Sequence, residues 1–152
     1  MIDDLDEHLP EAGSLDRAAL PPAMFLAWCG NLQLVSAGFV EAHQSLLVRL
    51  RYRDLSPAEF FTAATSGSID PVDLSPEGQA FARSYYPRYL EDLRLVFGPD
   101  IYETRDDWTN YDLIAPQITQ HFMAWKGSAK RGHKQRRSNP GAGRKWWQRW
   151  RS

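Results

Sequence analysis

The stretch SPEGQAFARSYYPRYLEDLRLVF, residues 75–97, decides the fold class. Ser75 and Pro76 are typical of a helix start, because proline at the first helical position lacks only an N–H group that would have no intrahelical acceptor. Gly98 and Pro99 follow as stop signals. The stretch therefore predicts one long helix over 76–97, bent near Pro87, where a backbone hydrogen bond is lost. Its buried face is expected to contain Phe81, Tyr85, Tyr89, Leu93 and Val96.

Helical spacing continues on both sides of this stretch. Pro21 and Pro22 precede an apolar run with aligned positions 25, 28, 32 and 35, and a second stripe covers residues 39–50. Ser56-Pro57-Ala58-Glu59 matches a capping box and predicts a short third helix. A last helix is expected to begin at Asp112, and only 69–74 or 95–102 has the character of a short strand. We therefore predict a mostly all-α protein with about five helices around one core.

Composition narrows the class of protein. The chain has 152 residues, of which 43% are hydrophobic and 24% are charged, as in one ordinary globular domain. No apolar run reaches the ~18 residues of a membrane span, and the acidic first residues do not resemble a secretory signal, so we expect a cytoplasmic protein. The single cysteine, Cys29, excludes a disulfide within the chain.

Charge is divided unevenly along the chain. Residues 1–125 hold 19 acidic and 8 basic residues, a net charge of −11, whereas residues 126–152 hold 10 basic residues and no acidic one. We expect an acidic and loose N-terminal arm over 1–20, a helical domain over 21–126, a flexible basic linker over 127–143, and a tryptophan-rich cationic tail over 144–152.

The cationic tail has three alternative interpretations. Its contact residues are expected to be Arg144, Lys145, Trp146, Trp147, Arg149, Trp150 and Arg151. Cations and stacked tryptophans suit RNA or other nucleic acid, and the same residues suit an anionic membrane surface. The tail also matches the charge of the acidic body, in the same chain or in another copy.

An acidic and aromatic turn precedes the last helix. We predict that it binds a partner protein through Asp106, Asp107, Trp108, Asn110, Tyr111 and Asp112, because rigid aromatic side chains dominate interface energies. The same residues could instead cap a helix and anchor the turn to the core. A general acid/base pair or a calcium site is the third alternative, but the spacing of a calcium loop is missing.

Other candidate chemistry is weak. His43 and His121 lack the i, i+4 partner that a metal site would show, and Cys29 lies in an apolar helix without a neighbouring base. The sequence shows neither a phosphate-binding loop nor a Gly-x-Ser-x-Gly turn. We therefore expect no catalytic residue, no metal and no cofactor.

Several blocks together resemble a family of small bacterial proteins known only as a domain of unknown function. The blocks are MFLAW at 24–28, SPAEF at 56–60, LSPEGQAFARSYY at 74–86, YLED at 89–92, DWTNYDLIAP at 107–116 and FMAWK at 122–126. Some members of the family end in a similar tryptophan-rich basic tail. The resemblance covers about 20–126, and it implies a helical, cytosolic protein of the kind found as immunity or accessory factors beside secreted toxins. A histidine-glycine pair typical of the family before Met24 is replaced here by Pro22-Ala23.

These observations favour a non-enzymatic protein-binding module. We expect an immunity or antitoxin-like protein, or an adaptor, whose acidic helical surface binds a basic partner such as a nuclease-type toxin. The alternative is a membrane-peripheral or nucleic-acid-associated factor that acts through the cationic tail.

Overall fold

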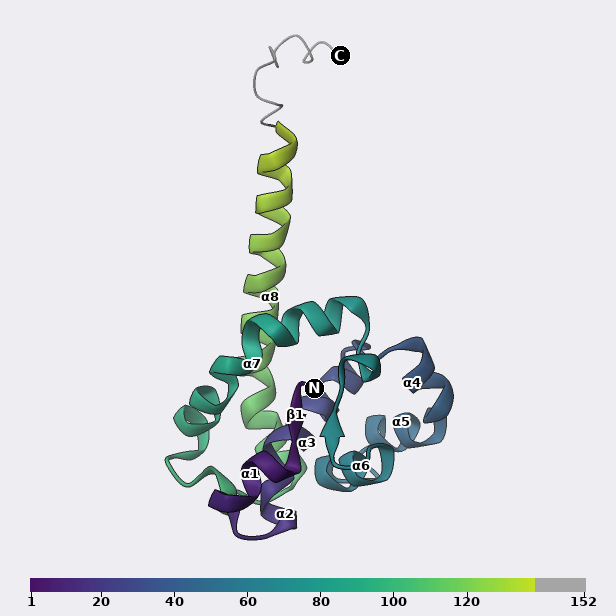
Figure 1. The fold of residues 1–152 in the computed structure, drawn as a ribbon, viewed down its shortest axis with the longest axis vertical. Helices are drawn as coiled ribbons and strands as arrows, with labels where there is room; N and C mark the ends of the chain where they lie inside the picture. The colour runs from purple at the N-terminus through teal and green to yellow at the C-terminus, as the bar shows by residue number, and fades with distance from the viewer. Residues whose placement is uncertain (139–152) are drawn as a thin grey trace. The chain divides into compact units, whose positions relative to one another are not determined.

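A computed structural model describes residues 1–138, and the side chains of residues 1–128. The chain divides into two units, Met1–Ile118 and Thr119–Ser152. Eight α-helices account for most of the described residues, which confirms the all-α class (Figure 1). In chain order they are α1 (Leu5–Ala12), α2 (Leu15–Ala18), α3 (Leu20–Asn31), α4 (Ala37–Ala42), α5 (Gln44–Arg51), α6 (Pro57–Ala64), α7 (Pro76–Phe97) and α8 (Trp108–Ser138). The remaining elements are strands β1 (Asp3–Asp4) and β2 (Ser68–Ile69) and the 3-10 turns η1 (Pro71–Asp73) and η2 (Ile101–Glu103).

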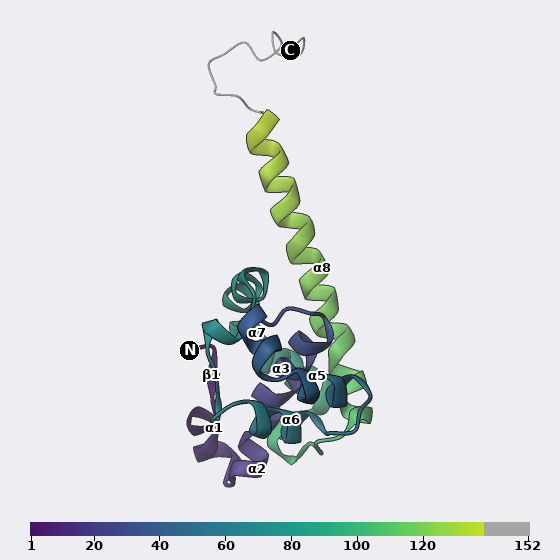
Figure 2. The ribbon, with the colours of Figure 1, turned by 90° about the vertical axis from the view of Figure 1, so that its right-hand side faces the viewer.

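Helix α3 is the centre of the first unit. It is apolar on all sides, and every residue from Leu20 to Gly30 is buried, so it has no solvent-facing stripe. Figure 2 shows α3 near the middle of the unit, and it contacts α5, α6 and α7. The predicted alignment of positions 25, 28, 32 and 35 is wrong at Leu32, which lies beyond the helix end and is 39% exposed.

Helix α7 has the predicted bounds and packs its aromatic face against α3. Phe81 and Tyr85 are stacked with ring centroids 5.1 Å apart, and the buried Tyr89 hydroxyl donates to the carbonyl oxygen of Pro21 at 2.7 Å. Pro87 lies inside the helix, and Figure 1 shows the helix bending along its length. The capping box at Ser56 is also confirmed, with Pro57 at the first position of α6.

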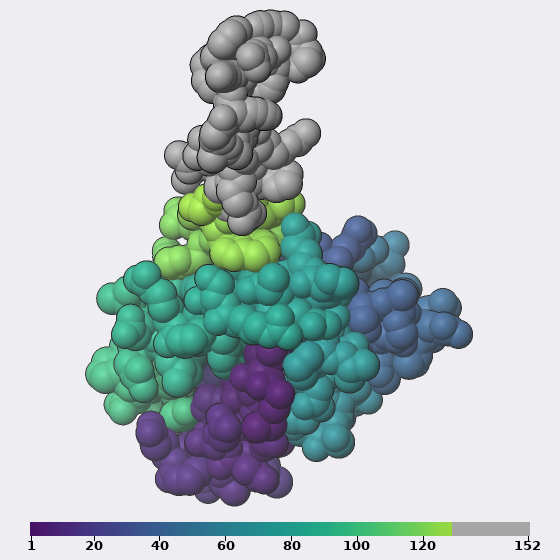
Figure 3. All heavy atoms as spheres, turned by 45° about the horizontal axis from the view of Figure 1, so that its top comes forward, coloured from purple at the N-terminus to yellow at the C-terminus, as the bar shows by residue number. Residues whose placement is uncertain are grey.

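Residues 1–20 are folded into the first unit rather than forming a loose arm. Strand β1 pairs antiparallel with β2, with Asp3 opposite Ile69, and β2 overlaps the expected strand region 69–74 at Ile69 only. Asp4 and Ser14 cap α1 and α2 through their side chains. In Figure 3 the purple N-terminal residues lie against teal segments of the same unit. High acid content predicted a loose arm, but local caps and strand pairing order it.

Helix number and the last helix also differ from expectation. The predicted helix over 39–50 divides at His43 into α4 and α5, and α1 and α2 are additional, so the described chain has more than five helices. Helix α8 begins at Trp108 rather than at Asp112 and continues to Ser138. Residues 127–138 of the expected linker are therefore helical, since lysine, arginine and glutamine are good helix formers. Residues 139–143 and the cationic tail lie outside the described residues.

Candidate functional site

The predicted acidic and aromatic turn lies where α8 begins, and its first two carboxylates cap helices. Asp106 accepts hydrogen bonds from the Ser56 hydroxyl at 2.5 Å and from the Ala58 N–H at 2.9 Å. Burial raises the pKa of Asp106, and these two hydrogen bonds partly offset that rise. Asp107 accepts from the Asn110 N–H at 2.8 Å. The two carboxylates thus hold the first turns of α6 and α8.

The rest of this turn contacts Arg53 and the end of α3. The Arg53 guanidinium donates two hydrogen bonds to Asp112, at 3.0 and 2.7 Å, and lies 4.6 Å from the ring centroid of Trp108. The Trp108 indole N–H donates to the carbonyl oxygen of Leu55 at 2.9 Å. Hydrogen bonding to Arg53 lowers the pKa of Asp112. This arrangement is the anchoring alternative considered from the sequence.

Tyr111 and Asn110 complete the same set of internal contacts. Tyr111 is buried and its hydroxyl accepts from the Asn31 amide at 2.9 Å. The Asn110 amide donates to the carbonyl oxygen of Arg105 at 2.9 Å. All six residues predicted to bind a partner are therefore brought together, and each makes contacts within the first unit. Asp112 remains exposed despite its ion pair.

Asp106 also belongs to a hollow of about 410 Å³, which we call the acidic groove. Its walls are apolar and come from Leu5, Leu15, Ala19 and Ala58, and its carboxylates come from Asp16, Glu59 and Asp106. Leu15 is 59% exposed, although leucine is usually buried. The acidic groove therefore combines an open apolar surface with negative charge from α2, α6 and the turn before α8.

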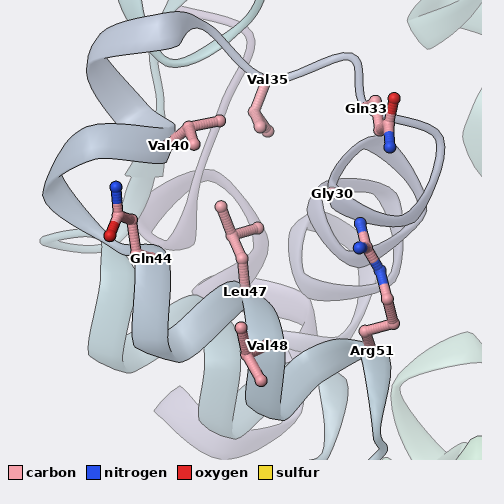
Figure 4. A pocket seen from close by; sticks show the side chains of 8 residues that line it. All are labelled: Gly30, Gln33, Val35, Val40, Gln44, Leu47, Val48 and Arg51. Carbon is pink, nitrogen blue, oxygen red and sulfur yellow. The ribbon is translucent and has the colours of Figure 1, made fainter.

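A second hollow of about 510 Å³, which we call the aliphatic groove, lies between the end of α3 and helices α4 and α5. Figure 4 shows Val35, Val40, Leu47 and Val48 on one side, and Gln33 and Arg51 on the side of Gly30. No motif in the sequence marked these residues together as a site. The signal available was the recurrence of positions 44, 47, 48 and 51, which lie on one face of a helix.

A buried polar network at the N-terminus was also missed. The Asp3 carboxylate lies 2.8 Å from His8 Nε2 and accepts a short hydrogen bond from the Tyr86 hydroxyl. Because a carboxylate only accepts, Nε2 carries a proton, and Nδ1 of a neutral ring accepts from the Tyr102 hydroxyl at 2.6 Å. Each ring nitrogen and both Asp3 oxygens thus have partners. The network joins β1 and α1 to α7 and η2.

The remaining sequence candidates are dispersed. Cys29 is fully buried, and burial strongly raises the pKa of its thiol. His43 packs against Phe39 with ring centroids 4.6 Å apart, and His121 lies in the second unit. Among residues 1–128, no group of three His, Cys, Asp or Glu side chains is arranged to hold a metal ion.

The second unit has an aromatic pair near its start. Phe122 and Trp125 are stacked with ring centroids 6.0 Å apart, and the Lys126 ammonium lies 5.3 Å from the Phe122 ring centroid. Within the described part of the chain, no helix has both the length and the apolar character needed to cross a bilayer. All tail residues predicted to contact membrane or nucleic acid, Arg144 to Arg151, lie outside the described residues.

A family model described as a domain of unknown function (DUF7832) matches residues 1–105. The chain belongs to the DUF7832 family. This confirms the expected relationship to an uncharacterised domain family, with a match that begins at residue 1 and ends before α8. No curated protein and no solved structure matches the chain. The aliphatic groove and the Asp3 network lie within the DUF7832 domain, whereas Asp106 and α8 follow it.

Proposed function

We propose that this DUF7832 protein is a non-enzymatic, cytoplasmic protein-binding module that recognises a basic partner through the acidic groove. In this proposal it acts as an immunity or antitoxin-like protein or as an adaptor. The acidic groove is the observation that carries the proposal. The acidic surface expected from the sequence is therefore assigned to α1, α2 and α6, with Asp106 at its edge, rather than to residues 107–112.

The shape and chemistry of the acidic groove suit a lysine or arginine side chain. Such side chains place an aliphatic stem on apolar surface while the charged head reaches a polar rim. Leu5 and Leu15 supply the apolar surface, and Asp16 and Glu59 supply exposed carboxylates. A basic side chain from a partner would thus bury its stem and pair its head in one site.

The charge of the whole unit supports the same kind of partner. Residues 1–118 hold 19 acidic and 8 basic residues, a net charge of −11. A field of this sign attracts a basic protein, raises the association rate and makes it fall with added salt. The same field repels phosphate, which argues against nucleic acid as the ligand of this unit.

The internal contacts of the acidic and aromatic turn explain why it is not assigned the binding role. Asp106, Asp107 and Asp112 already accept hydrogen bonds from Ser56, Asn110 and Arg53. A partner that used these carboxylates would have to replace those bonds. Glu59 also accepts a hydrogen bond, from the Ser56 N–H, but Asp16 and Glu59 are both exposed, so a partner can reach them without unpacking the turn.

The test compares two matched triple variants of the full chain in crosslinked pull-downs from the native host. The groove variant carries Leu15→Ser, Asp16→Asn and Glu59→Gln, and glutamine preserves the capping-box hydrogen bond of residue 59. The control variant carries Leu95→Ser, Glu91→Gln and Asp100→Asn, which removes one exposed leucine and two exposed carboxylates outside the groove.

We expect the native chain and the control variant to bind a basic protein in stoichiometric amount. The groove variant should not bind it. Retention of the basic protein should decrease steeply as salt is added. A partner captured equally by both variants would move the binding surface elsewhere. Turnover of a substrate by the purified chain would contradict the non-enzymatic part.

A second candidate function rests on the segregation of charge, with 10 basic residues and no acidic residue after position 125. In this alternative the chain is a membrane-peripheral or nucleic-acid-associated factor that acts through the cationic tail. Replacing Trp146, Trp147 and Trp150 by alanine should then abolish binding to anionic vesicles or to RNA. Binding that is unchanged in this variant would remove the alternative.

A further inference from the structure

The aliphatic groove is lined by apolar side chains that are partly exposed to solvent. Val40 is 41% exposed and Val48 is 54% exposed, and both line the hollow together with Leu47. Its volume of about 510 Å³ falls within the range of about 300–1,000 Å³ typical of small-molecule sites. Such sites are mostly apolar and contain a few polar groups that orient the ligand. The groove has this composition.

Two of the polar residues, Gln33 and Arg51, lie at one side of the aliphatic groove, and the third, Gln44, lies on the side of Val40 (Figure 4). Figure 4 shows Arg51 and Gln33 on the side of Gly30, across from Val35 and Val40. Arg51 is exposed and forms no ion pair with any side chain of residues 1–128. Arg53, two residues later, is bound to Asp112 on both of its terminal nitrogens. Arg51 is thus a cation that faces an apolar hollow and has no anion of its own there.

Gln33 places a second polar group at the aliphatic groove. Its φ is 60°, a left-handed conformation that side-chain-bearing residues rarely adopt. It follows α3 at the position where glycine normally ends a helix, and the Leu34 N–H donates to the carbonyl oxygen of Cys29 at 2.8 Å. The strained backbone carries an amide group to the mouth of the groove, beside Arg51. A glycine would satisfy the backbone but would remove this amide.

We propose that the aliphatic groove binds a medium-chain aliphatic carboxylate. The alkyl chain would lie against Val40, Leu47 and Val48, and the carboxylate would accept hydrogen bonds from the Arg51 guanidinium and the Gln33 amide. An alkyl chain matches the aliphatic lining, which contains no aromatic ring among its residues. A carboxylate matches the planar, multiple-donor geometry of arginine. This site uses different residues from the acidic groove, so it does not depend on the proposed protein partner.

The experiment is a titration of the full chain with sodium decanoate below its micelle concentration, followed by calorimetry and by amide NMR shifts. We expect one saturable site whose shifts centre on residues 33–51. Shortening the ligand to octanoate removes two methylenes and should weaken binding about 15-fold. Decanol and decyltrimethylammonium test the head group, and both should bind at least tenfold more weakly than decanoate.

Three variants test the residues. Arg51→Gln should weaken decanoate binding about tenfold. Arg49→Gln is the matched control, because Arg49 is an exposed arginine of the same helix that does not line the groove. Val48→Asp, at a half-exposed position, should abolish binding while thermal unfolding shows that the chain remains folded.

Each opposite result overturns the inference. Equal weakening by Arg51→Gln and Arg49→Gln would show general attraction to positive charge. Equal affinity for decanol and decanoate would show that the carboxylate is not recognised. Binding that survives Val48→Asp would place the ligand outside the groove, for instance on the basic C-terminal residues. Absence of saturable binding would leave the groove to a partner's polypeptide and contradict a small-molecule ligand.

Discussion

Alkaline pH should unfold this protein cooperatively, because three tyrosines of α7 have buried hydroxyl groups that must stay protonated. Tyr85 donates to Asp92 at 2.7 Å, Tyr86 donates to Asp3, and Tyr89 donates to a backbone carbonyl oxygen at 2.7 Å. Burial is the largest cause of a raised pKa at each of the three. Neighbouring carboxylates raise the pKa of Tyr85 and Tyr86 further.

The size of the effect follows from proton linkage. Tyrosines of the unfolded chain ionise near a pKa of about 10, whereas the native state keeps these three protons well above that pH. Above about pH 10 the unfolded state thus binds about three fewer protons, and the free energy of unfolding falls with rising pH. At about 1.4 kcal/mol per proton and pH unit, the loss is about 4 kcal/mol by pH 11 and about 8 kcal/mol by pH 12. A domain of ordinary stability, about 5–15 kcal/mol, should unfold in or just above this range.

The assay is urea unfolding of the full chain at about pH 8, 10 and 11, followed by circular dichroism, with tyrosinate absorbance measured in parallel. Tyr85→Phe removes one of the three hydroxyls and should reduce the pH slope by about 1.4 kcal/mol per unit. The urea midpoint of the native chain should fall from pH 8 to pH 11, and it should fall less in Tyr85→Phe. If the urea midpoint stays constant from pH 8 to pH 11, these three hydroxyls lose their protons equally in the native and unfolded states and the reasoning is wrong.

Three substitutions give further expected outcomes. Gly78→Ala should lower the free energy of unfolding by about 1–3 kcal/mol or more, because the new Cβ would overlap a backbone carbonyl oxygen of the α3–α4 connection. Gly38→Ala is the control: its new Cβ meets only a hydroxyl oxygen at 4.0 Å, so this variant should be neutral or stabilising in thermal unfolding. Arg53→Ala should lower the free energy of unfolding by about 1 kcal/mol at neutral pH, because it removes the ion pair with Asp112. Since the pKa of Asp112 is lowered in the folded state, the ion pair stabilises the fold above about pH 4 and this stabilisation is lost at lower pH. Urea unfolding at neutral pH and below about pH 4 would show the difference. Gln33→Gly should raise the free energy of unfolding by about 1 kcal/mol, measured by the urea midpoint, because glycine tolerates φ of 60°.

The sequence predicted those helices whose ends are set by residues close in the chain. The capping box at Ser56 and the proline-started helix over 76–97 were found because caps, prolines and a 3–4 residue period act within one segment. The acidic and aromatic turn was also recognised as a cluster. Whether this turn is an exposed binding edge or an anchor depends on its contact with Arg53, which lies more than fifty positions before Asp112. No local sequence pattern indicates this contact.

Long-range pairing explains what the sequence could not show. Residues 1–20 look like a polar arm, since their acids suggest solvation rather than packing. Asp3 is nevertheless 2% exposed, because His8 and the distant Tyr86 satisfy its carboxylate, and because β1 pairs with β2. A buried charge is acceptable only where such partners converge, and the partner from α7 is 83 positions away. The two grooves likewise arise from helix packing and not from any motif.

Two non-glycine residues, Gln33 and Arg53, have a left-handed backbone. The reason for this conformation is structural at Arg53 and, in our proposal, functional at Gln33. Arg53 follows α5 with φ of 60°, and its side chain binds Asp112 and lies over Trp108, contacts that a glycine would remove from the fold. Gln33 follows α3 with the same φ, but its side chain lines the aliphatic groove and makes no hydrogen bond with the described side chains. The backbone of Gln33 ends α3, but its side chain has no such structural task, and a strained position of this kind is expected where a ligand uses the side chain. Gln33→Gly should therefore stabilise the fold and weaken decanoate binding in the same protein. A variant that gains stability with unchanged decanoate affinity would show that Gln33 has no part in the groove.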